Sequence, residues 1–281
     1  MQVLPIPEHM SQIHAAGEEV VFEIDPGTAR LRKLVGMYRE GQVYLIYGPT
    51  GSGKTTLFSY LPIIMSVKNS FDHVKDRYFY IVSTDGGFDI NRLIYIAREH
   101  GLGDDMINHI KSHINVFYVT EFSGQHEIIT DTIRRIATRY KPAIISVDSI
   151  ANLYALELTR VKKSGDEYVE GIGYKRLRIY PNMLNEQVET LYSMAVNYGA
   201  IVFITSWLRT KLGEQQDQEK AYYDFIGGKS LRYYSSVILR TEILKYKPKI
   251  VKVECRKHRF MGVEGKYVKI KLSEKGVEDY E

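Results

Sequence analysis

The sequence predicts an α/β fold built on a mostly parallel sheet with helices on both faces. Three observations predict it. First, a phosphate-binding loop at residues 48–55 stands between an apolar run and a helical segment. Second, apolar runs alternate with amphipathic segments as far as residue 205. Third, three strand-like runs without helices between them follow residue 236, which predicts an antiparallel C-terminal extension of one sheet edge.

The elements of the parallel part follow from hydrophobic periodicity. The expected strands lie at residues 43–47, 78–82, 114–119, 143–147 and 201–205. The expected helices lie at residues 56–65, 90–100, 126–140 and 183–198. Ile129, Ile133 and Ile136 share one face of the third helix, and Gly101 and Gly199 follow two of the others. In the C-terminal part, the expected strands lie at residues 237–244, 250–256 and 267–272, joined by short polar turns such as residues 246–249.

Two segments, residues 156–181 and 209–229, look irregular. The first carries three glycines and mixed charges, and the second is polar and ends in Gly227-Gly228. Both follow strands at their carboxyl ends, where open α/β sheets bind ligands. Long loops in a compact domain are usually functional, and the alternative here is a pair of plain solvated loops.

Composition describes an ordinary globular chain of 281 residues, with 44% hydrophobic and 26% charged residues and a net charge of +4. No apolar run is long enough to span a membrane, and the N-terminal residues lack a signal-peptide layout, so we expect a cytoplasmic protein with no membrane partner. The single cysteine, Cys255, excludes an internal disulfide and a cysteine metal cluster. It lies in an apolar run and is expected to be a buried structural thiol.

The loop at 48–55 matches G-x-x-x-x-G-K-[ST], which predicts binding of a nucleoside triphosphate with Mg²⁺. Glycines let backbone N–H groups converge on the phosphates, and the following helix directs its positive end at them. Lys54 can reach the β and γ oxygens, and the Thr55 hydroxyl can ligate Mg²⁺. The alternative is a glycine-rich turn with an exposed lysine. The residues expected to bind the nucleotide here are Gly48, Pro49, Thr50, Gly51, Ser52, Gly53, Lys54, Thr55 and Thr56.

Two acidic residues stand at strand ends. Asp148 ends a buried strand, where phosphate-loop proteins place the carboxylate that holds Mg²⁺. Asp85 follows strand 78–82 and precedes Gly86-Gly87, so it is a candidate for orienting or deprotonating an attacking water. The alternative for Asp85 is a turn-forming Asp-Gly pair.

The ordered set of motifs resembles the RecA/RadA recombinase family, and most closely its archaeal paralogs of the RadB type. The stretches that carry the resemblance are Thr84-Asp85-Gly86-Gly87-Phe88 with Arg92, Asp148-Ser149-Ile150, Gly227-Gly228 and Lys257-His258-Arg259. They extend over residues 22–272, nearly the whole chain. The resemblance implies a RecA-like P-loop NTPase core at residues 22–281 with an N-terminal extension at 1–21.

The resemblance also implies roles for particular residues. Asp85 stands where the family has the glutamate that activates water, and Arg92 where it has the arginine that packs on the adenine. Lys257 and Arg259 resemble the lysine and arginine of KaiC and DnaB-type ATPases, which reach the γ-phosphate of a neighbouring subunit. A homo-oligomer, either ring or filament, is therefore expected. Because strand residues two apart share a face, both charges can project to one site, and the alternative is a solvated basic edge strand.

The sequence departs from the family pattern in three ways. Aspartate at position 85 is one methylene shorter than glutamate, which is expected to slow hydrolysis. Thr205-Ser206-Trp207 replaces the Asn-Gln pair that links the γ-phosphate to the DNA loop, which puts coupling between ATP and DNA in question. The family's N-terminal helical DNA-binding domain is expected to be missing before Phe22, which favours an accessory paralog over the strand-exchange enzyme.

Single-stranded DNA is the expected ligand of the two irregular segments. Cations for phosphates and aromatics for base stacking are present in them: Arg160, Lys162, Lys163, Lys175, Arg176, Arg178, Tyr168, Tyr174, Tyr222 and Tyr223. The leading function is an ATPase, slow or DNA-stimulated, that assists DNA repair and recombination, with the main recombinase as a further partner. The alternatives are a hexameric DnaB-type helicase and a KaiC-like regulatory ATPase that does not bind DNA.

Overall fold

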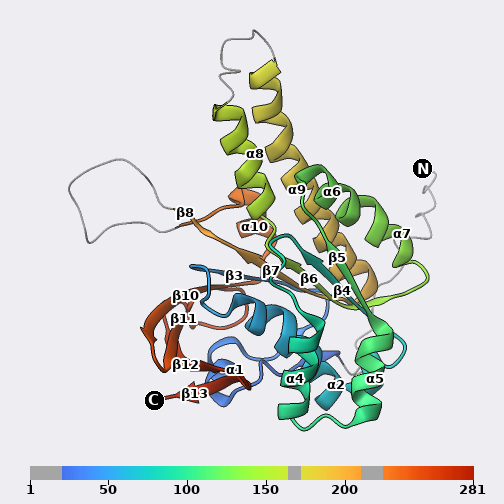
Figure 1. Cartoon of the computed structure of the whole chain (residues 1–281), viewed down its shortest axis with the longest axis vertical. Coiled ribbons are helices and arrows are strands. Elements are labelled where there is room, and N and C mark those ends of the chain that lie inside the picture. Colours follow the sequence, from blue (N-terminus) through green and yellow to red (C-terminus); the bar gives the residue numbers. More distant parts are fainter. Residues whose placement is uncertain (1–20, 164–171, 210–223) are drawn as a thin grey trace, which may run out of the picture.

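The computed structural model describes residues 21–163, 172–209 and 224–281, and the side chains of 161–178 and 209–224 fall outside this description. Its centre is a sheet of nine strands in the order β13-β12-β11-β10-β3-β7-β6-β4-β5 (Figure 1). The parallel strands are β3 (Val43–Tyr47), β4 (Tyr78–Ser83), β5 (Ile114–Tyr118), β6 (Pro142–Asp148) and β7 (Ile201–Ser206). All five lie where the apolar runs predicted them.

The C-terminal strands are β10 (Val237–Tyr246), β11 (Lys249–His258), β12 (Tyr267–Ser273) and β13 (Gly276–Tyr280). Strand β10 pairs in parallel with β3 on one side and antiparallel with β11 on the other, and β12 and β13 continue the antiparallel order. The expected antiparallel extension of one sheet edge is therefore confirmed. We refer to β10–β13 as the antiparallel extension.

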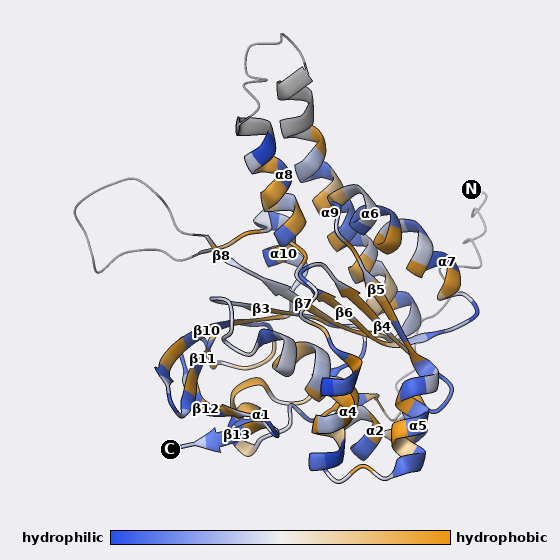
Figure 2. Ribbon diagram, viewed as in Figure 1, coloured by the Kyte–Doolittle hydropathy of each residue, from blue (hydrophilic) through white to orange (hydrophobic). Residues whose placement is uncertain are grey.

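Helices cover both faces of the sheet (Figures 1 and 2). On one face lie α1 (Ala29–Val35), the π-helical turn η2 (Thr56–Tyr60) with α2 (Leu61–Asn69), α3 (Phe71–Val74), α4 (Ile90–Glu99) and α5 (Asp104–His113). On the other lie α6 (Phe122–Glu127), η3 (Ile128–Ile133), α7 (Arg134–Ile136), α8 (Asn152–Lys163), α9 (Ile172–Tyr198) and α10 (Gly228–Tyr234).

Strand β3 shows why the sheet needs cover on both sides. Tyr44 and Ile46 belong to the core under one helical layer, whereas Val43, Leu45 and Tyr47 belong to the core under the other. Alternate residues of a strand point to opposite faces, so a strand with a continuous apolar run needs to be covered on both faces of the sheet. Within the described ranges, none of the helices combines the length and apolarity that crossing a membrane requires.

The expectation that residues 156–181 are irregular was wrong for the described part of that segment; residues 164–171 lie outside the description. Helix α8 continues to Lys163 and α9 begins at Ile172, with Pro181 inside it. The two helices lie side by side and project from the sheet (Figure 1). Mixed charge and an internal proline argue locally against a helix, but packing against a partner decides helix formation more than propensity does.

The segment 209–229 was also expected to be irregular, and its ends are not. Strand β8 (Leu208–Arg209) pairs antiparallel with β9 (Asp224–Phe225), and α10 begins at Gly228. Gly227 has φ 140° and Gly228 has φ 73°, both in the region that favours glycine. The pair therefore turns the chain from β9 into α10.

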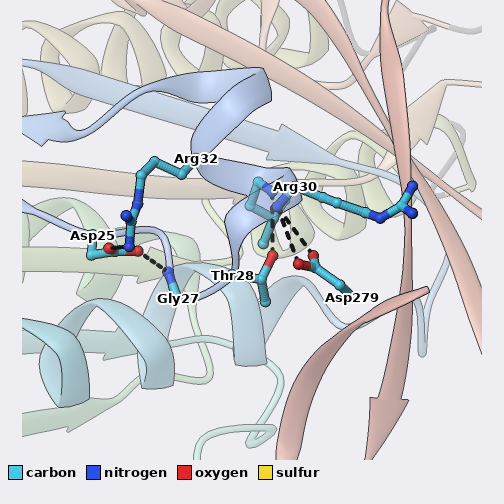
Figure 3. Close-up of polar contacts among 7 residues, drawn as sticks. Asp25, Gly27, Thr28, Arg30, Arg32 and Asp279 are labelled. Carbon is cyan, nitrogen blue, oxygen red and sulfur yellow. Dashed lines mark hydrogen bonds and ion pairs between the residues drawn. The ribbon is translucent and has the colours of Figure 1, made fainter. Parts of the chain in front are cut away.

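The N-terminal elements β1 (Glu23–Ile24), α1 and β2 (Tyr38–Arg39) were not predicted from the sequence. Figure 3 shows how α1 is tied to the rest of the fold. Thr28 is the N-cap of α1, and the carboxylate of Asp279 on β13 accepts a hydrogen bond from Arg30 N–H at 3.2 Å. Asp25 is ion-paired with Arg32. A carboxylate at a helix N-terminus complements the helix dipole, so Asp279 fixes the start of α1 to the last strand of the sheet.

Candidate nucleotide site

The phosphate-binding loop connects the buried strand β3 to a helix that starts at Lys54. Gly51 has φ 76° and Gly53 has φ 84°, a conformation that side chains disfavour. The loop borders a cavity of about 760 Å³. The cavity is lined by the loop residues Thr50, Gly51, Gly53, Lys54, Thr55 and Thr56, by Asp85, Gly87, Arg92, Asp148 and Trp207, and by two turns of the antiparallel extension, at 246–249 and 272–274.

Lys54 lies against the loop itself. Its ammonium donates to the carbonyl oxygens of Gly48 at 3.1 Å and Pro49 at 2.9 Å, and the residue is only 7% exposed. Burial lowers the pKa of Lys54, and the charges of Asp148 and Asp85 oppose that shift. A cation held here faces the space where the loop's N–H groups would bind phosphates.

Asp148 is the most enclosed acid of the cavity. Its two carboxylate oxygens accept hydrogen bonds from the hydroxyls of Thr55 and Thr205, and the residue is 2% exposed. Burial raises the pKa of the Asp148 carboxyl, while the two hydroxyl donors lower it. The peptide bond that follows, to Ser149, is cis.

The Thr55–Asp148 pair fits Mg²⁺ in its chemistry. Mg²⁺ prefers oxygen ligands and is commonly held by one or two side chains together with substrate phosphates and water. In the part of the chain that the structure describes, three or more His, Cys, Asp or Glu side chains do not gather in a metal-binding group. The described residues therefore do not form a complete metal site by themselves. Thr55 and Asp148 can instead share Mg²⁺ with a bound triphosphate.

Asp85 lies at the mouth of the same cavity, and it also forms the turn that was the alternative interpretation. Its Oδ1 accepts a hydrogen bond from Gly87 N–H at 2.9 Å, and the side chain is exposed. The neighbouring Thr84 is buried and exchanges hydrogen bonds with Ser149 at 2.9 Å, which ties the end of β4 to the end of β6. The turn role does not exclude activation of water, which stays a prediction.

Arg92, on α4, lines the cavity on the side of the antiparallel extension. Its guanidinium donates to the backbone carbonyl of Ser273 at 3.1 Å and lies 5.6 Å from the ring centroid of Tyr95. The expected packing of Arg92 on an adenine stays a prediction, and its position beside the turn at 272–274 defines where that base would lie.

The loop glycines face side chains of the antiparallel extension, a feature that the sequence did not reveal. A Cβ on Gly48 would stand 1.9 Å from Thr241 Oγ1, and one on Gly53 would stand 2.6 Å from Leu272. The Thr241 hydroxyl also lies 2.7 Å from the Ser52 hydroxyl. Packing against the antiparallel extension therefore disfavours a side chain at both positions. No sequence signal links strands so distant in the chain to the loop.

Lys257 and Arg259 lie far from this cavity. Lys257 is eight residues along β11 from Lys249 at the cavity edge, roughly 26 Å in an extended strand. Its ammonium donates to the carbonyls of Arg232 and Ser235, each at 2.6 Å, and Arg259 donates to the carbonyl of Tyr233. Both cations thus share a face, as their spacing predicts, and that face meets the C-terminal end of α10.

The residues of the Thr205-Ser206-Trp207 stretch contact two different parts of the structure. Thr205 donates to Asp148, and Trp207 lines the cavity. Ser206 instead donates its hydroxyl to the carbonyl of Ile226, directly before Gly227. Ser206 therefore ties the end of β7 to the entry of α10, and its hydroxyl proton is engaged there instead of facing a phosphate.

Most residues expected to contact DNA lie outside the described side chains: Lys162, Lys163, Tyr168, Tyr174, Lys175, Arg176, Arg178, Tyr222 and Tyr223. Arg160 is described, and it is exposed and pairs with Glu157 at 2.7 Å. The expected convergence of these residues on DNA stays a prediction.

Comparisons with known proteins agree with this geometry. The family model described as Rad51 matches residues 18–280. Among solved structures, the chain is similar to one described as the RadB recombinase, with 25% sequence identity, a TM-score of 0.66, and 92% of this chain and 100% of that chain covered. Among curated proteins, no match was found. The resemblance and the RecA-like fold are confirmed, while the expected boundary at residue 22 stays a prediction.

Proposed function

The chain belongs to the Rad51 family, and from this premise we propose that it is a RecA-like recombinase paralog that binds and hydrolyses Mg-ATP, binds single-stranded DNA and assists DNA repair and recombination. The family supports a recombinase-type role in repair. One observation supports the nucleotide part most directly. The phosphate-binding loop, Thr55 and Asp148 converge on one cavity, although Asp148 is 93 residues away from Thr55 in the chain.

In the proposed mechanism, the loop's backbone N–H groups bind the β-phosphate and Lys54 turns from the carbonyls of Gly48 and Pro49 to the β and γ oxygens. Asp85, at the cavity mouth, orients or deprotonates the attacking water. Thr55 and Asp148 would hold Mg²⁺, which would neutralise charge at the phosphates when bound. Arg92 packs on the adenine.

The remaining role, stabilisation of the charge that develops on the transferred phosphoryl group, is assigned to Lys257 and Arg259 of an adjacent subunit. Their distance from their own cavity supports action in trans within a ring or filament. A cation supplied in trans can neutralise that developing charge. Mixing an Arg259→Ala subunit with a Lys54→Ala subunit tests this assignment, and partial recovery of turnover is the expected result. An inactive mixture in a verified oligomer would remove its support.

The deciding experiment for the nucleotide site measures ATP hydrolysis and ATP binding by the unaltered chain, by Lys54→Ala and by Lys111→Ala. Lys111 is an exposed lysine on α5 and serves as the matched control. We expect turnover to vanish in Lys54→Ala and to persist in Lys111→Ala. Equal turnover in all three would refute the assignment of the loop.

DNA binding is tested by salt titration of affinity for a single strand. If about four cations engage phosphates, log affinity falls with log salt at a slope of roughly −3. A slope near zero would overturn the DNA assignment.

A second candidate function rests on the Lys257/Arg259 pair, which DnaB-type motors and KaiC-like ATPases share. Stimulation of ATP turnover by single-stranded DNA separates the recombinase paralog and the motor from the regulatory ATPase. Strand displacement on a forked substrate then separates the motor from the paralog.

A further inference from the structure

The turn between β10 and β11 forms one wall of the nucleotide cavity. Tyr246, Lys247, Pro248 and Lys249 all line it, together with the phosphate-binding loop. The sequence presents this segment as a short polar turn. In the structure, the Lys249 ammonium lies 3.4 Å from the point where a Cβ of Gly51 would stand, so it reaches the apex of the loop.

Several cations of the antiparallel extension have acidic partners. Lys252 and Arg256 pair with Glu254 at 3.2 and 2.8 Å, and Lys271 pairs with Glu278 at 3.0 Å. The half-buried Lys249 makes no hydrogen bond or ion pair with any residue in the described ranges. Within the described ranges, this ammonium lies beside a loop of backbone N–H donors without a counter-charge, and an anionic ligand in the cavity would supply one.

We infer that Lys249 is a second lysine ligand for the nucleotide phosphates, supplied by the same chain from the antiparallel extension; this inference rests on the proposed nucleotide binding. Lys54 reaches the phosphates from the start of the helix after the loop. Lys249 reaches them from β11 and contacts the terminal phosphates beside Gly51. The ligand class is a polyphosphate, and the base and sugar take no part in this contact.

The test is calorimetric binding of ATP, inorganic tripolyphosphate and adenosine to the unaltered chain, Lys249→Ala, Lys249→Arg and Lys245→Ala. Lys245 is an exposed lysine of the same hairpin that does not line the cavity, so it is the matched control. A charge-assisted contact predicts a loss of about 10-fold in affinity for ATP and tripolyphosphate in Lys249→Ala. Lys249→Arg and Lys245→Ala should bind both within about twofold of the unaltered chain, and any adenosine affinity should stay unchanged.

Equal affinity of Lys249→Ala and the unaltered chain for ATP and tripolyphosphate overturns the inference and leaves the proposed function standing. A loss of the same size in Lys245→Ala also overturns it, because the effect would then be that of general surface charge. If the unaltered chain binds neither ATP nor tripolyphosphate, the proposed function fails and the inference fails with it. Thermal unfolding of each variant verifies that the chain is folded.

Discussion

Thr241 links the antiparallel extension to the phosphate-binding loop, and replacing it by valine tests whether the loop depends on that link. The residue is fully buried on β10, and its hydroxyl lies 2.7 Å from the Ser52 hydroxyl and 3.2 Å from the carbonyl oxygen of Tyr47. Valine keeps the shape and removes the hydroxyl. Ser52 retains its own bond to the Pro49 carbonyl at 2.8 Å, whereas the contacts of the Thr241 hydroxyl with Ser52 and with the Tyr47 carbonyl are both lost.

The expected effect of Thr241→Val follows from the hydrogen bonding that the substitution removes. A buried hydrogen bond contributes about 1 kcal/mol, and leaving a polar atom unpaired raises the total to about 2 kcal/mol. The contact with Ser52 helps to hold the loop in its glycine-dependent conformation. Without it, the loop is less ordered before phosphate binds, and ordering it costs part of the binding free energy. We therefore expect ATP affinity to fall by about 5- to 30-fold. The free energy of unfolding without nucleotide should fall by about 1–2 kcal/mol.

The assay is calorimetric titration with Mg-ATP, paired with denaturant unfolding of the nucleotide-free chain. Thr241→Ser is the matched control, because serine keeps the hydroxyl and removes only a methyl group. It should bind ATP within about twofold of the unaltered chain. If folded Thr241→Val binds ATP as tightly as Thr241→Ser does, the loop is independent of the antiparallel extension and the reasoning is refuted.

Two further predictions concern stability and reactivity. Arg77 donates to the backbone carbonyls of Pro142, Tyr198 and Gly199 at 2.7–3.1 Å, so Arg77→Met should lower the free energy of unfolding by about 2–4 kcal/mol and Tm by roughly 5–15 °C. Exposed Arg139→Met is the control, and an equal Tm for both variants in a thermal melt would contradict the role. Burial raises the pKa of Cys255 to about 11, so at pH 8 only about 0.1% is thiolate. A thiol reagent should label the unfolded chain at once and the folded chain only as fast as it opens; rapid labelling of the folded chain would show that the thiol is accessible.

The sequence predicted the five parallel strands because each is a run of mostly apolar residues, and four of them are buried along nearly their whole length. It missed β13, whose residues Gly276–Tyr280 are mostly polar because the strand lies at a sheet edge. It also missed the helical parts of 156–181, since packing between α8 and α9 outweighs the local charge pattern and Pro181. Local patterns thus identified strands by their apolar runs, including the edge strand β5, and failed where polar composition or tertiary contacts decide.

The residues of the candidate site also fall into some that the sequence predicted and others that it missed. Lys54, Asp85 and Asp148 stand at or just after the ends of strands of one parallel sheet, so their motifs predicted a common edge, and all three line the cavity. Thr241 and Lys249 belong to the antiparallel extension and carry no motif of their own. Only the pairing of β10 with β3 brings them to the loop, and no local pattern encodes that pairing.

The contacts of Lys257 and Arg259 with α10 set a condition on any assembly of this chain. Their charges satisfy carbonyls at the end of that helix, where the helix itself supplies no donors. If these cations turn to a nucleotide bound by a neighbour, α10 loses them as capping groups. The carbonyls of α10 and the neighbour's nucleotide therefore compete for the same donors. Since such linkage is reciprocal, whatever strengthens the contacts of Lys257 and Arg259 with α10 must weaken their contact with the neighbour's nucleotide. Helix α10 would then act as an intramolecular competitor of the phosphate.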